Sequence, residues 1–262
     1  MSKNNLFASI LITNFNKDRY LNRCIKSCIS QTLIKKTEIL VFDDCSTDNS
    51  LSILKKYQNK ILYIKNSKKK YTSAPLNQIF GIRKLFKKSK GNIIFLLDSD
   101  DYFKINKIKI IYQLFKKNPK LQFVQDVPFL KKDNKLMKLK KKNSNYSIWP
   151  SFYPTSCIAI KRDFFMNFTK NLKSNKFPNL EIDARLSIYA FLTKNFYISK
   201  KNLTIYNFDP SGITSKYKKF SLAWWKKRDE AFKYMIFLMK KMKIKFKPSF
   251  DFYLTKFINY FI

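Results

Sequence analysis

The sequence predicts an α/β protein with a mostly parallel sheet flanked by helices. Short apolar runs, which are typical of buried strands, recur at 7–12, 38–42 and 93–97. Each run ends in a polar loop, and a segment with helical spacing of apolar residues follows. This order is the βαβ pattern of a parallel sheet. At 262 residues the chain is long enough to bury a full core.

The first strand is expected at Phe7–Ile12, where the run FASILI stops at the polar stretch TNFNKD. Asn16 and Asp18 are suited to start the helix that follows, whose apolar residues recur at i, i+3 and i+4. Cys24 and Cys28 belong to that apolar face and lie one turn apart. They are expected to be small core residues, because none of the cysteines has metal-site spacing.

The second expected strand runs directly into the acidic motif DDCSTD at 43–48. Ser46 or Thr47 can cap the next helix, so part of this polarity has a structural explanation. That explanation does not require Asp43 or Asp44. Both should project from the strand end, where a base and a ribose could be hydrogen-bonded.

The third strand is expected at 61–64, and a lysine-rich loop follows at 65–70. The lysines could meet diphosphate charge, although a solvated lysine run is the commoner explanation. Residues 75–86 predict a helix with Pro75 in its first turn. Gly91 and Asn92 then turn the chain into the next strand.

The stretch IIFLLDSDD at 93–101 is the most informative part of the chain. Five apolar residues lead into Asp98, Asp100 and Asp101, at the carboxyl end of a central strand, where open α/β sheets bind ligands. Carboxylates this close repel one another unless a cation or hydrogen-bond donors hold them, and hard oxygen ligands suit Mg²⁺ or Mn²⁺. Two interpretations stay open: a metal–diphosphate site, or an acidic turn whose aspartates cap the next helix.

The following segments continue the alternation. In order, we expect a helix at 105–117, strands at 121–124 and 127–130, a hairpin turn at 132–134, a mobile lysine-rich loop at 138–145, an aromatic, proline-rich stretch at 149–155, a strand at 156–160, and short strands at 196–198 and 203–206.

A helix is expected at 179–192, with Asn179 as its cap. Its apolar side is expected to carry Ile182, Leu186, Tyr189 and Ala190. Glu181 and Asp183 then lie near its N-terminus. Simple complementarity to the helix dipole would explain both acids, so a catalytic role is one of two alternatives here.

The C-terminal region predicts two helices. Residues 221–242 form a long amphipathic segment that carries WWKKR at 224–228. The tail at 248–262 would be apolar over much of its circumference, so it must dock on the body, on a partner or on a membrane surface. No stretch approaches the roughly 18 apolar residues of a membrane span, and no signal-peptide pattern is seen. We expect a cytoplasmic protein, with the tail as a candidate contact to the inner face of the membrane.

The composition is strongly basic, with 54 Lys and Arg against 17 Asp and Glu and a net charge of +37. Such charge suggests an anionic partner, but the accompanying excess of Asn, Ile, Phe and Tyr also fits an AT-rich genome. No helix-turn-helix, zinc-finger or RNP-type pattern occurs, so nucleic acid is not an expected partner. Histidine is absent. Acid–base chemistry must therefore fall to carboxylates, Lys, Tyr or Cys, and Ser-His-Asp or Cys-His catalysis is excluded.

These landmarks together resemble the family 2 inverting glycosyltransferases, which have the GT-A fold. The resemblance runs over about 7–206. It rests on ILITNFN at 10–16, DDCSTD at 43–48 and DSDD at 98–101, each in the family's order and at a strand end. The last of these matches the family's metal-binding D-x-D motif.

The resemblance implies a role for each matching position. The residues implied to contact the nucleotide sugar are Thr13, Asn14, Asp43, Asp44, Asn77, Asp98 and Ser99, and Asp100 is implied to coordinate Mn²⁺ or Mg²⁺ bridging the diphosphate. Asp183 is the best match to the family's catalytic base, with Glu181 second. Two positions depart from the family pattern. Leu76 stands where an arginine often precedes Asn77, and Cys45 replaces a glycine, which asks for a less strained turn.

The resemblance implies transfer of a sugar from a nucleotide-diphosphate sugar to a hydroxyl of a glycan or lipid-linked acceptor, in surface polysaccharide or lipid-linked glycan synthesis. Such an inverting transfer needs one carboxylate as base and a divalent ion to stabilise the leaving diphosphate. The expected division is a GT-A domain at 1–215, with its nucleotide-binding half to about 130 and its acceptor half at 131–215, and a helical extension at 216–262. Two alternatives remain: a nucleotidyltransferase, although the chain's 3 glycines form no glycine-rich phosphate loop, and a non-catalytic nucleotide or polyanion binder.

Overall fold

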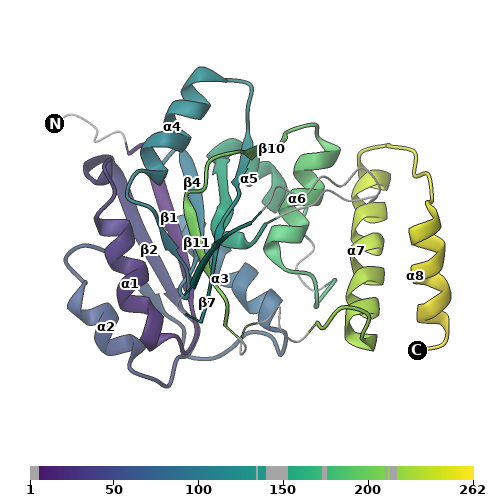
Figure 1. Ribbon diagram of the computed structural model, residues 1–262, viewed down its shortest axis with the longest axis horizontal. Coiled ribbons are helices and arrows are strands. Elements are labelled where there is room, and N and C mark those ends of the chain that lie inside the picture. The colour runs from purple at the N-terminus through teal and green to yellow at the C-terminus, as the bar shows by residue number, and fades with distance from the viewer. Residues whose placement is uncertain (1–5, 134, 140–152, 173–175, 210–211, 213–216) are drawn as a thin grey trace.

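A large sheet flanked by helices forms the body of the protein (Figure 1). The computed structural model describes residues 6–133, 135–139, 153–172, 176–209, 212 and 217–262. Within them, seven strands make the large sheet and four make a smaller one. The predicted α/β class with a mostly parallel sheet is confirmed.

The large sheet has the strand order β10-β6-β9-β4-β1-β2-β3. Only β9 pairs antiparallel with its neighbours among these described strands, and the remaining pairings are parallel. Its strands are β1 (Ala8–Asn14), β2 (Thr37–Asp43), β3 (Leu62–Lys65), β4 (Ile93–Asp98), β6 (Phe123–Asp126), β9 (Ile158–Lys161) and β10 (Phe196–Ser199). The three strands that were expected to end in polar loops, β1, β2 and β4, are therefore adjacent at the centre.

Helices cover both faces of this sheet. They are α1 (Asp18–Ile29), α2 (Ser50–Lys56), α3 (Ala74–Lys88), α4 (Lys107–Lys117), α5 (Arg162–Lys170) and α6 (Ile182–Leu192), with short 3-10 turns at Ile34–Lys36 and Thr155–Cys157. Successive strand residues point to opposite faces. Ile10 and Ile12 therefore pack with α1, α2 and α4, whereas Leu11 packs with α3, α5 and α6. Cys24 and Cys28 are fully buried in the first of these layers, as predicted.

The smaller sheet has the order β5-β11-β7-β8. Its strands are β5 (Tyr102–Phe103), β7 (Phe129–Lys132), β8 (Lys135–Lys138) and β11 (Thr204–Asn207). β7 and β8 pair antiparallel, with Lys132 opposite Lys135, which confirms the predicted hairpin although Asn134 lies outside the described residues. Most of the expected mobile loop at 138–145 and of the aromatic stretch at 149–155 also lies outside them.

Gly91 is required where the chain enters β4. A Cβ placed on it would lie 2.3 Å from the carbonyl carbon of Ala8 and 2.6 Å from the amide nitrogen of Ser9. Both contacts are with backbone, which has little freedom to move away. The Gly91 amide also donates to the Ser9 hydroxyl at 2.8 Å. Glycine at this position therefore lets β4 lie directly beside the start of β1.

Two C-terminal helices, α7 (Leu222–Lys241) and α8 (Phe250–Tyr260), stand side by side at one end of the molecule (Figure 1). α7 begins at Ser221, whose hydroxyl accepts from the Trp224 amide, and its buried side joins the same apolar core as α6. Arg228 holds the two helices together by pairing with Asp251. None of the helices in the described part of the chain combines the length and apolar character that a membrane crossing requires.

The start and the packing of α6 differ from the prediction. The helix begins at Ile182, because Glu181 still has extended backbone angles, and the Asn179 side chain does not cap it. Asn179 instead donates to the Glu230 carboxylate on α7 at 2.8 Å. The four residues of the expected apolar side are all buried, and the burial extends further, over most of the circumference of α6 between the sheet layer and α7.

Candidate active site

The ends of β1, β2 and β4 bring three predicted segments together. The parallel register places Asn14 opposite Asp43 and Thr13 opposite Asp98. The Asn14 amide donates to the Asp43 carboxylate at 2.7 Å, and the Thr13 hydroxyl donates to Asp98 at 3.2 Å. Carboxyl ends of parallel strands meet at one edge of a sheet, which is why residues 29 to 85 positions apart converge here.

The turn after β2 is organised by Asp43, which is fully buried. Its carboxylate accepts from the hydroxyl and the amide of Ser46, at 2.6 and 3.1 Å. Ser46 therefore stabilises this turn and does not cap α2, whose N-cap is Asn49. Cys45 has a φ of 62°, so the expected less strained turn is wrong: the residue keeps the left-handed conformation that favours glycine.

Asp44 lies beside this turn and is also buried. One of its oxygens accepts from the Asn66 side chain at 2.9 Å, and its amide donates to the Asn14 carbonyl oxygen at 2.9 Å. The Asn14 side-chain oxygen is buried, and no hydrogen-bond partner is found for it among the described residues. The edge of the sheet between Asn14 and Asp44 therefore offers acceptor oxygens to a ligand.

The motif at the end of β4 forms an acidic cluster. Burial, followed by the charge of Asp100, raises the pKa of Asp98 to about 7. Burial likewise raises the pKa of Asp100, and that of Asp101 is raised well above its usual value by burial and then by its two acidic neighbours. Ser156 holds the cluster, because its hydroxyl accepts from the Asp98 amide at 3.0 Å and donates to Asp101 at 2.5 Å. Asp101 thus has a structural place in the cluster.

Lys17, in the loop after β1, supplies positive charge to this cluster. Its ammonium lies 3.4 Å from an Asp100 oxygen and is bonded to Asp209. Burial acts to lower the pKa of Lys17, but Asp209 and Asp100 outweigh it and the pKa is raised. Sequence reasoning missed this residue. Its position in a polar loop directly after a buried strand could have indicated a site residue. Its partner Asp209 could not be inferred from the sequence.

Asp183 lies in the first turn of α6, with Glu181 just before it. One Asp183 oxygen accepts from the Ala184 amide at 2.7 Å. Burial, followed by the charge of Glu181, raises the pKa of Asp183 to about 7. Lys227 of α7 pairs with Glu181 and opposes this rise. The WWKKR stretch therefore reaches the site through Lys227, a role that the sequence did not reveal.

Tyr206, on strand β11 of the smaller sheet, is affected by the charges of both acidic groups. Burial raises its pKa, and the charges of Asp101, Asp100, Asp98 and Asp183 raise it further, in that order. Four carboxylates from β4, the turn after it and α6 thus act on one phenol. The acids of the D-x-D motif and the predicted base therefore lie within electrostatic reach of the same side chain, Tyr206, which sequence reasoning missed.

Two other predicted site residues, Asn77 and Ser99, are buried and form hydrogen bonds within the protein. Asn77, in α3, is buried, and its side-chain amide bonds both the N–H and the C=O of Tyr71, at 2.9 and 2.8 Å. It therefore fixes the segment before α3. Ser99 is buried, and its amide donates to the Thr13 carbonyl oxygen at 3.1 Å. The next residue along α3, Gln78, donates to Asp98 at 2.7 Å and was not predicted.

The donor set fits a hard divalent cation. Within the described ranges there is no group of three or more His, Cys, Asp or Glu arranged to enclose a metal ion. The available ligands are carboxylate oxygens of Asp98 and Asp100 and the Gln78 amide oxygen, which is buried without a partner among the described residues. Hard oxygen donors of this kind, with charge that a cation would neutralise, suit Mg²⁺ or Mn²⁺ completed by phosphate oxygens and water.

Comparison with known proteins gives sequence relatives of part of the chain. A Methanococcus voltae protein, dolichyl N-acetyl-alpha-D-glucosaminyl phosphate 3-beta-D-2,3-diacetamido-2,3-dideoxy-beta-D-glucuronosyltransferase, is 30% identical over 120 residues, 44% of this chain and 37% of that protein. Poly(ribitol-phosphate) beta-N-acetylglucosaminyltransferase TarS of Staphylococcus aureus is 34% identical over 100 residues, 38% of this chain and 17% of that protein. The alignments therefore span well under half of either relative.

Solved structures share the fold. TarS residues 1–349 in complex with UDP-GlcNAc match 87% of this chain and 66% of theirs, with a TM-score of 0.62 and 14% identity. A mannosyltransferase from Pyrobaculum calidifontis, in complex with GDP-Man and Mn²⁺, matches 92% of this chain and 65% of its own, with a TM-score of 0.60 and 11% identity. The family model described as glycosyl transferase family 2 matches residues 9–179, more than half of the chain. The chain belongs to glycosyl transferase family 2.

Proposed function

We propose that this protein is a metal-dependent inverting glycosyltransferase, which moves a sugar from a nucleotide-diphosphate sugar to a hydroxyl of a glycan or lipid-linked acceptor. The observation that carries the proposal is the meeting of Thr13, Asn14, Asp43 and Asp98 at the ends of β1, β2 and β4. The charge of Asp98 also acts on Asp183, which supports placing the proposed base beside this edge. Family membership supports it, because the match includes both the D-x-D motif and the nucleotide motif.

The donor nucleotide is proposed to lie along the ends of β1 and β2. Asn14 and Asp44 offer buried acceptor oxygens there, while Asp43 shapes the turn that positions them. Thr13 and Gln78 both donate to the same oxygen of Asp98, Oδ1, so that its carboxylate is oriented before a ligand arrives. Ser99 joins this edge to β1 through its backbone.

The diphosphate is proposed to bind next to Asp100, the residue that would hold Mn²⁺ or Mg²⁺ together with Asp98. A bound divalent cation supplies charge stabilisation for the leaving diphosphate. The chain's own cation, Lys17, is already directed at Asp100 and is positioned to pair with phosphate oxygens as well. Asp98 and Asp100 are thus proposed as ligands, and Lys17 as a diphosphate contact.

Asp183 is proposed to deprotonate the acceptor hydroxyl as that oxygen attacks the sugar. A pKa of about 7 suits this step, because a base works best when its pKa is close to the working pH. Asp183 is only partly buried, so an acceptor can reach it, and the Ala184 amide holds one of its oxygens and thereby orients the other. Glu181 is paired with Lys227, which supports a role in adjusting the basicity of Asp183.

The test is turnover of UDP-, GDP- and dTDP-sugars with Mn²⁺, after a thermal-stabilisation screen that identifies the base. Nucleoside diphosphate release that is lost in both Asp100→Ala and Asp183→Asn is expected. Release of pyrophosphate would instead identify a nucleotidyltransferase. Nucleotide-dependent stabilisation with no turnover of any donor would identify a non-catalytic binder.

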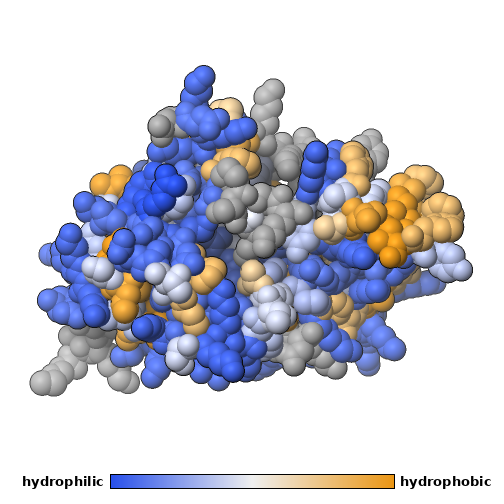
Figure 2. All heavy atoms as spheres, turned by 90° about the horizontal axis from the view of Figure 1, so that it is seen from below, coloured by the Kyte–Doolittle hydropathy of each residue, from blue (hydrophilic) through white to orange (hydrophobic). Residues whose placement is uncertain are grey.

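We also infer a peripheral membrane contact through the C-terminal tail, residues 248–262. Figure 2 shows hydrophobic side chains gathered at the end of the molecule where α7 and α8 lie. The most exposed of them are on α8, where Phe250 is 81% and Tyr260 85% exposed. Exposed lysines on the connection between α7 and α8, Lys243, Lys245 and Lys247, flank this surface and would face anionic lipid.

Vesicle co-sedimentation tests this contact. Phe257→Ser combined with Phe261→Ser should lower binding to vesicles that contain anionic lipid, since both side chains are exposed on this surface. Phe191→Ser is the matched control, because Phe191 is an exposed aromatic residue on α6. Equal binding by the double variant and the control would refute the contact.

A further inference from the structure

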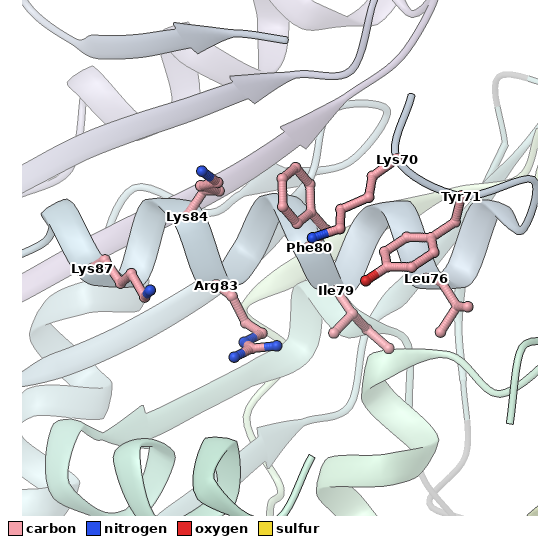
Figure 3. A pocket seen from close by; sticks show the side chains of 8 residues that line it. All are labelled: Lys70, Tyr71, Leu76, Ile79, Phe80, Arg83, Lys84 and Lys87. Carbon is pink, nitrogen blue, oxygen red and sulfur yellow. The ribbon is translucent and has the colours of Figure 1, made fainter. Parts of the chain in front are cut away.

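A second binding site is suggested by a basic pocket on α3, apart from the acidic site. Figure 3 shows that it lies along one side of the helix and beneath the segment that precedes it. The pocket has a volume of about 230 Å³. The lining residues that carry charge or aromatic rings are Lys70, Tyr71, Phe80, Arg83, Lys84 and Lys87.

The cations that line this pocket have no acid among the lining residues to neutralise them. α3 contains no Asp or Glu, and no acid lines the pocket. None of the ion pairs formed among the described residues involves Lys70, Arg83, Lys84 or Lys87. Arg83 is partly buried, so its guanidinium is less screened by water than the ammonium groups of the exposed lysines around it. Four positive charges around one hollow repel each other, and an anion would relieve that repulsion.

The spacing of these cations suits an extended anion. Phe80, Arg83, Lys84 and Lys87 follow one another at i, i+3, i+4 and i+7, so they share one side of the helix. Arg83 and Lys87 are one turn apart, about 6 Å along the helix axis. A chain with phosphate groups at a repeat of that order could place successive phosphates on successive turns.

The pocket also offers apolar surface. The rings of Tyr71 and Phe80 meet edge to face with centroids 6.5 Å apart. Lys70 lies 5.0 Å and Lys84 5.3 Å from the centroid of Phe80, so the ring and the cations form one mixed surface. Such a surface can contact the carbon skeleton of a sugar or polyol while the cations bind its phosphates.

The pocket is connected to the proposed active site through α3. Asn77 holds Tyr71 in place through two hydrogen bonds, and the adjacent Gln78 donates to Asp98. Ser73, which caps α3, donates to the Pro178 carbonyl oxygen shortly before α6 and Asp183. A chain lying in the pocket would therefore extend along α3 from the turn that contacts the acidic cluster.

We infer that this pocket binds the phosphate groups of a phosphate-bearing sugar or polyol chain that serves as acceptor. The inference rests on the proposed transferase function and adds the chemical class of the acceptor. A lipid bilayer fits less well, because the cations line a hollow and the exposed aromatic surface lies on α8 instead. Phosphate polymers are also what the name of the TarS relative describes.

The test uses a synthetic oligomer of eight glycerol-phosphate units as probe, with binding measured by fluorescence anisotropy. Arg83→Gln with Lys87→Gln removes two charges from the pocket. Lys116→Gln with Lys117→Gln is the matched control, because these exposed lysines occupy the last turn of α4 as Lys87 does in α3. Nucleotide-sugar hydrolysis without acceptor is measured in parallel, and it should be equal in both variants.

The pocket variant should bind the oligomer at least about 10-fold more weakly than the parent chain, and the control variant within about twofold. Equal losses in the two variants would overturn the inference, since the net charge alone would then explain binding. So would tight binding of a polyol oligomer without phosphates, or pocket-dependent binding to anionic vesicles alone. If the parent chain released no nucleoside diphosphate from any donor, with or without the oligomer, the proposed transferase function would be refuted instead, and the binding comparison would stay intact.

Discussion

We expect kcat/KM to fall at low pH (the acidic limb), with the midpoint of this fall near pH 7, because Asp183 must be deprotonated to act as base. Burial and the charge of Glu181 raise its pKa to about 7, and only the deprotonated carboxylate can accept the acceptor's proton. The deprotonated fraction is then about one tenth at pH 6, one half at pH 7 and nine tenths at pH 8. The value of kcat/KM should therefore rise about tenfold between pH 6 and pH 8.

The assay is release of nucleoside diphosphate at saturating Mn²⁺ and subsaturating donor. Asp183→Asn should lower kcat/KM by about 10²- to 10⁴-fold, the usual contribution of a general base, and the residual activity should lose the acidic limb. An acidic limb that persists unchanged in Asp183→Asn would refute the assignment, because another group would then be titrating.

Lys227 provides a sharper test of the same reasoning. Its charge lowers the pKa of Asp183 and pairs with Glu181, so Lys227→Met should move the acidic limb to higher pH. Lys226→Met is the control, because Lys226 is exposed on the same helix and makes no ion pair among the described residues. A shift of the midpoint to lower pH in Lys227→Met, or equal shifts in both variants, would show that the charge of Lys227 on Asp183 does not determine the pH dependence of kcat/KM.

Four further outcomes follow from the geometry. Removal of divalent metal by EDTA, or Asp100→Ala, should lower turnover by about 100-fold or more, and the variant should lose stabilisation by Mn²⁺ with nucleotide in a thermal melt. Gly91→Ala should lower the free energy of unfolding by about 3 kcal/mol in urea titrations, because its Cβ would overlap the backbone of β1. Lys107→Met should lower the same quantity by about 3–5 kcal/mol, since the Asp126 carboxylate, 2.7 Å from the buried ammonium, would lose its counter-charge. Cys45→Gly should raise it by about 0.5–1 kcal/mol with nucleotide binding kept, and an unchanged value would mean that the left-handed turn is not strained.

Much of the fold was predictable because buried strands and helices produce regular patterns of apolar residues in the sequence. The apolar runs before Asn14, Asp43 and Asp98 are short and unbroken, as strands covered on both faces must be. The ends of such strands meet at one edge of the sheet, so the sequence alone predicts that these polar residues lie close together. The position of Pro75 in the first turn of α3 likewise follows from local backbone chemistry.

Helix starts were less predictable where side chains had competing partners. Asn179 has the chemistry of a cap but bonds Glu230, and Ser46 bonds Asp43 instead of starting α2. A short polar side chain near a helix start can satisfy its hydrogen bonds locally or across the fold. The sequence contains both options, and only packing selects between them.

The sequence by itself determined the α/β class and which carboxylates end the central strands, because both follow from the local alternation of apolar runs and polar turns. Only the tertiary structure decided which charges meet. Lys17 and Asp209 are 192 positions apart, and Lys227 reaches Glu181 from a helix that docks on α6. Such pairings depend on the angles at which helices and strands pack, and no residue pattern within one segment records those angles. The same packing puts Asp183 on α6 within electrostatic reach of Asp98 on β4.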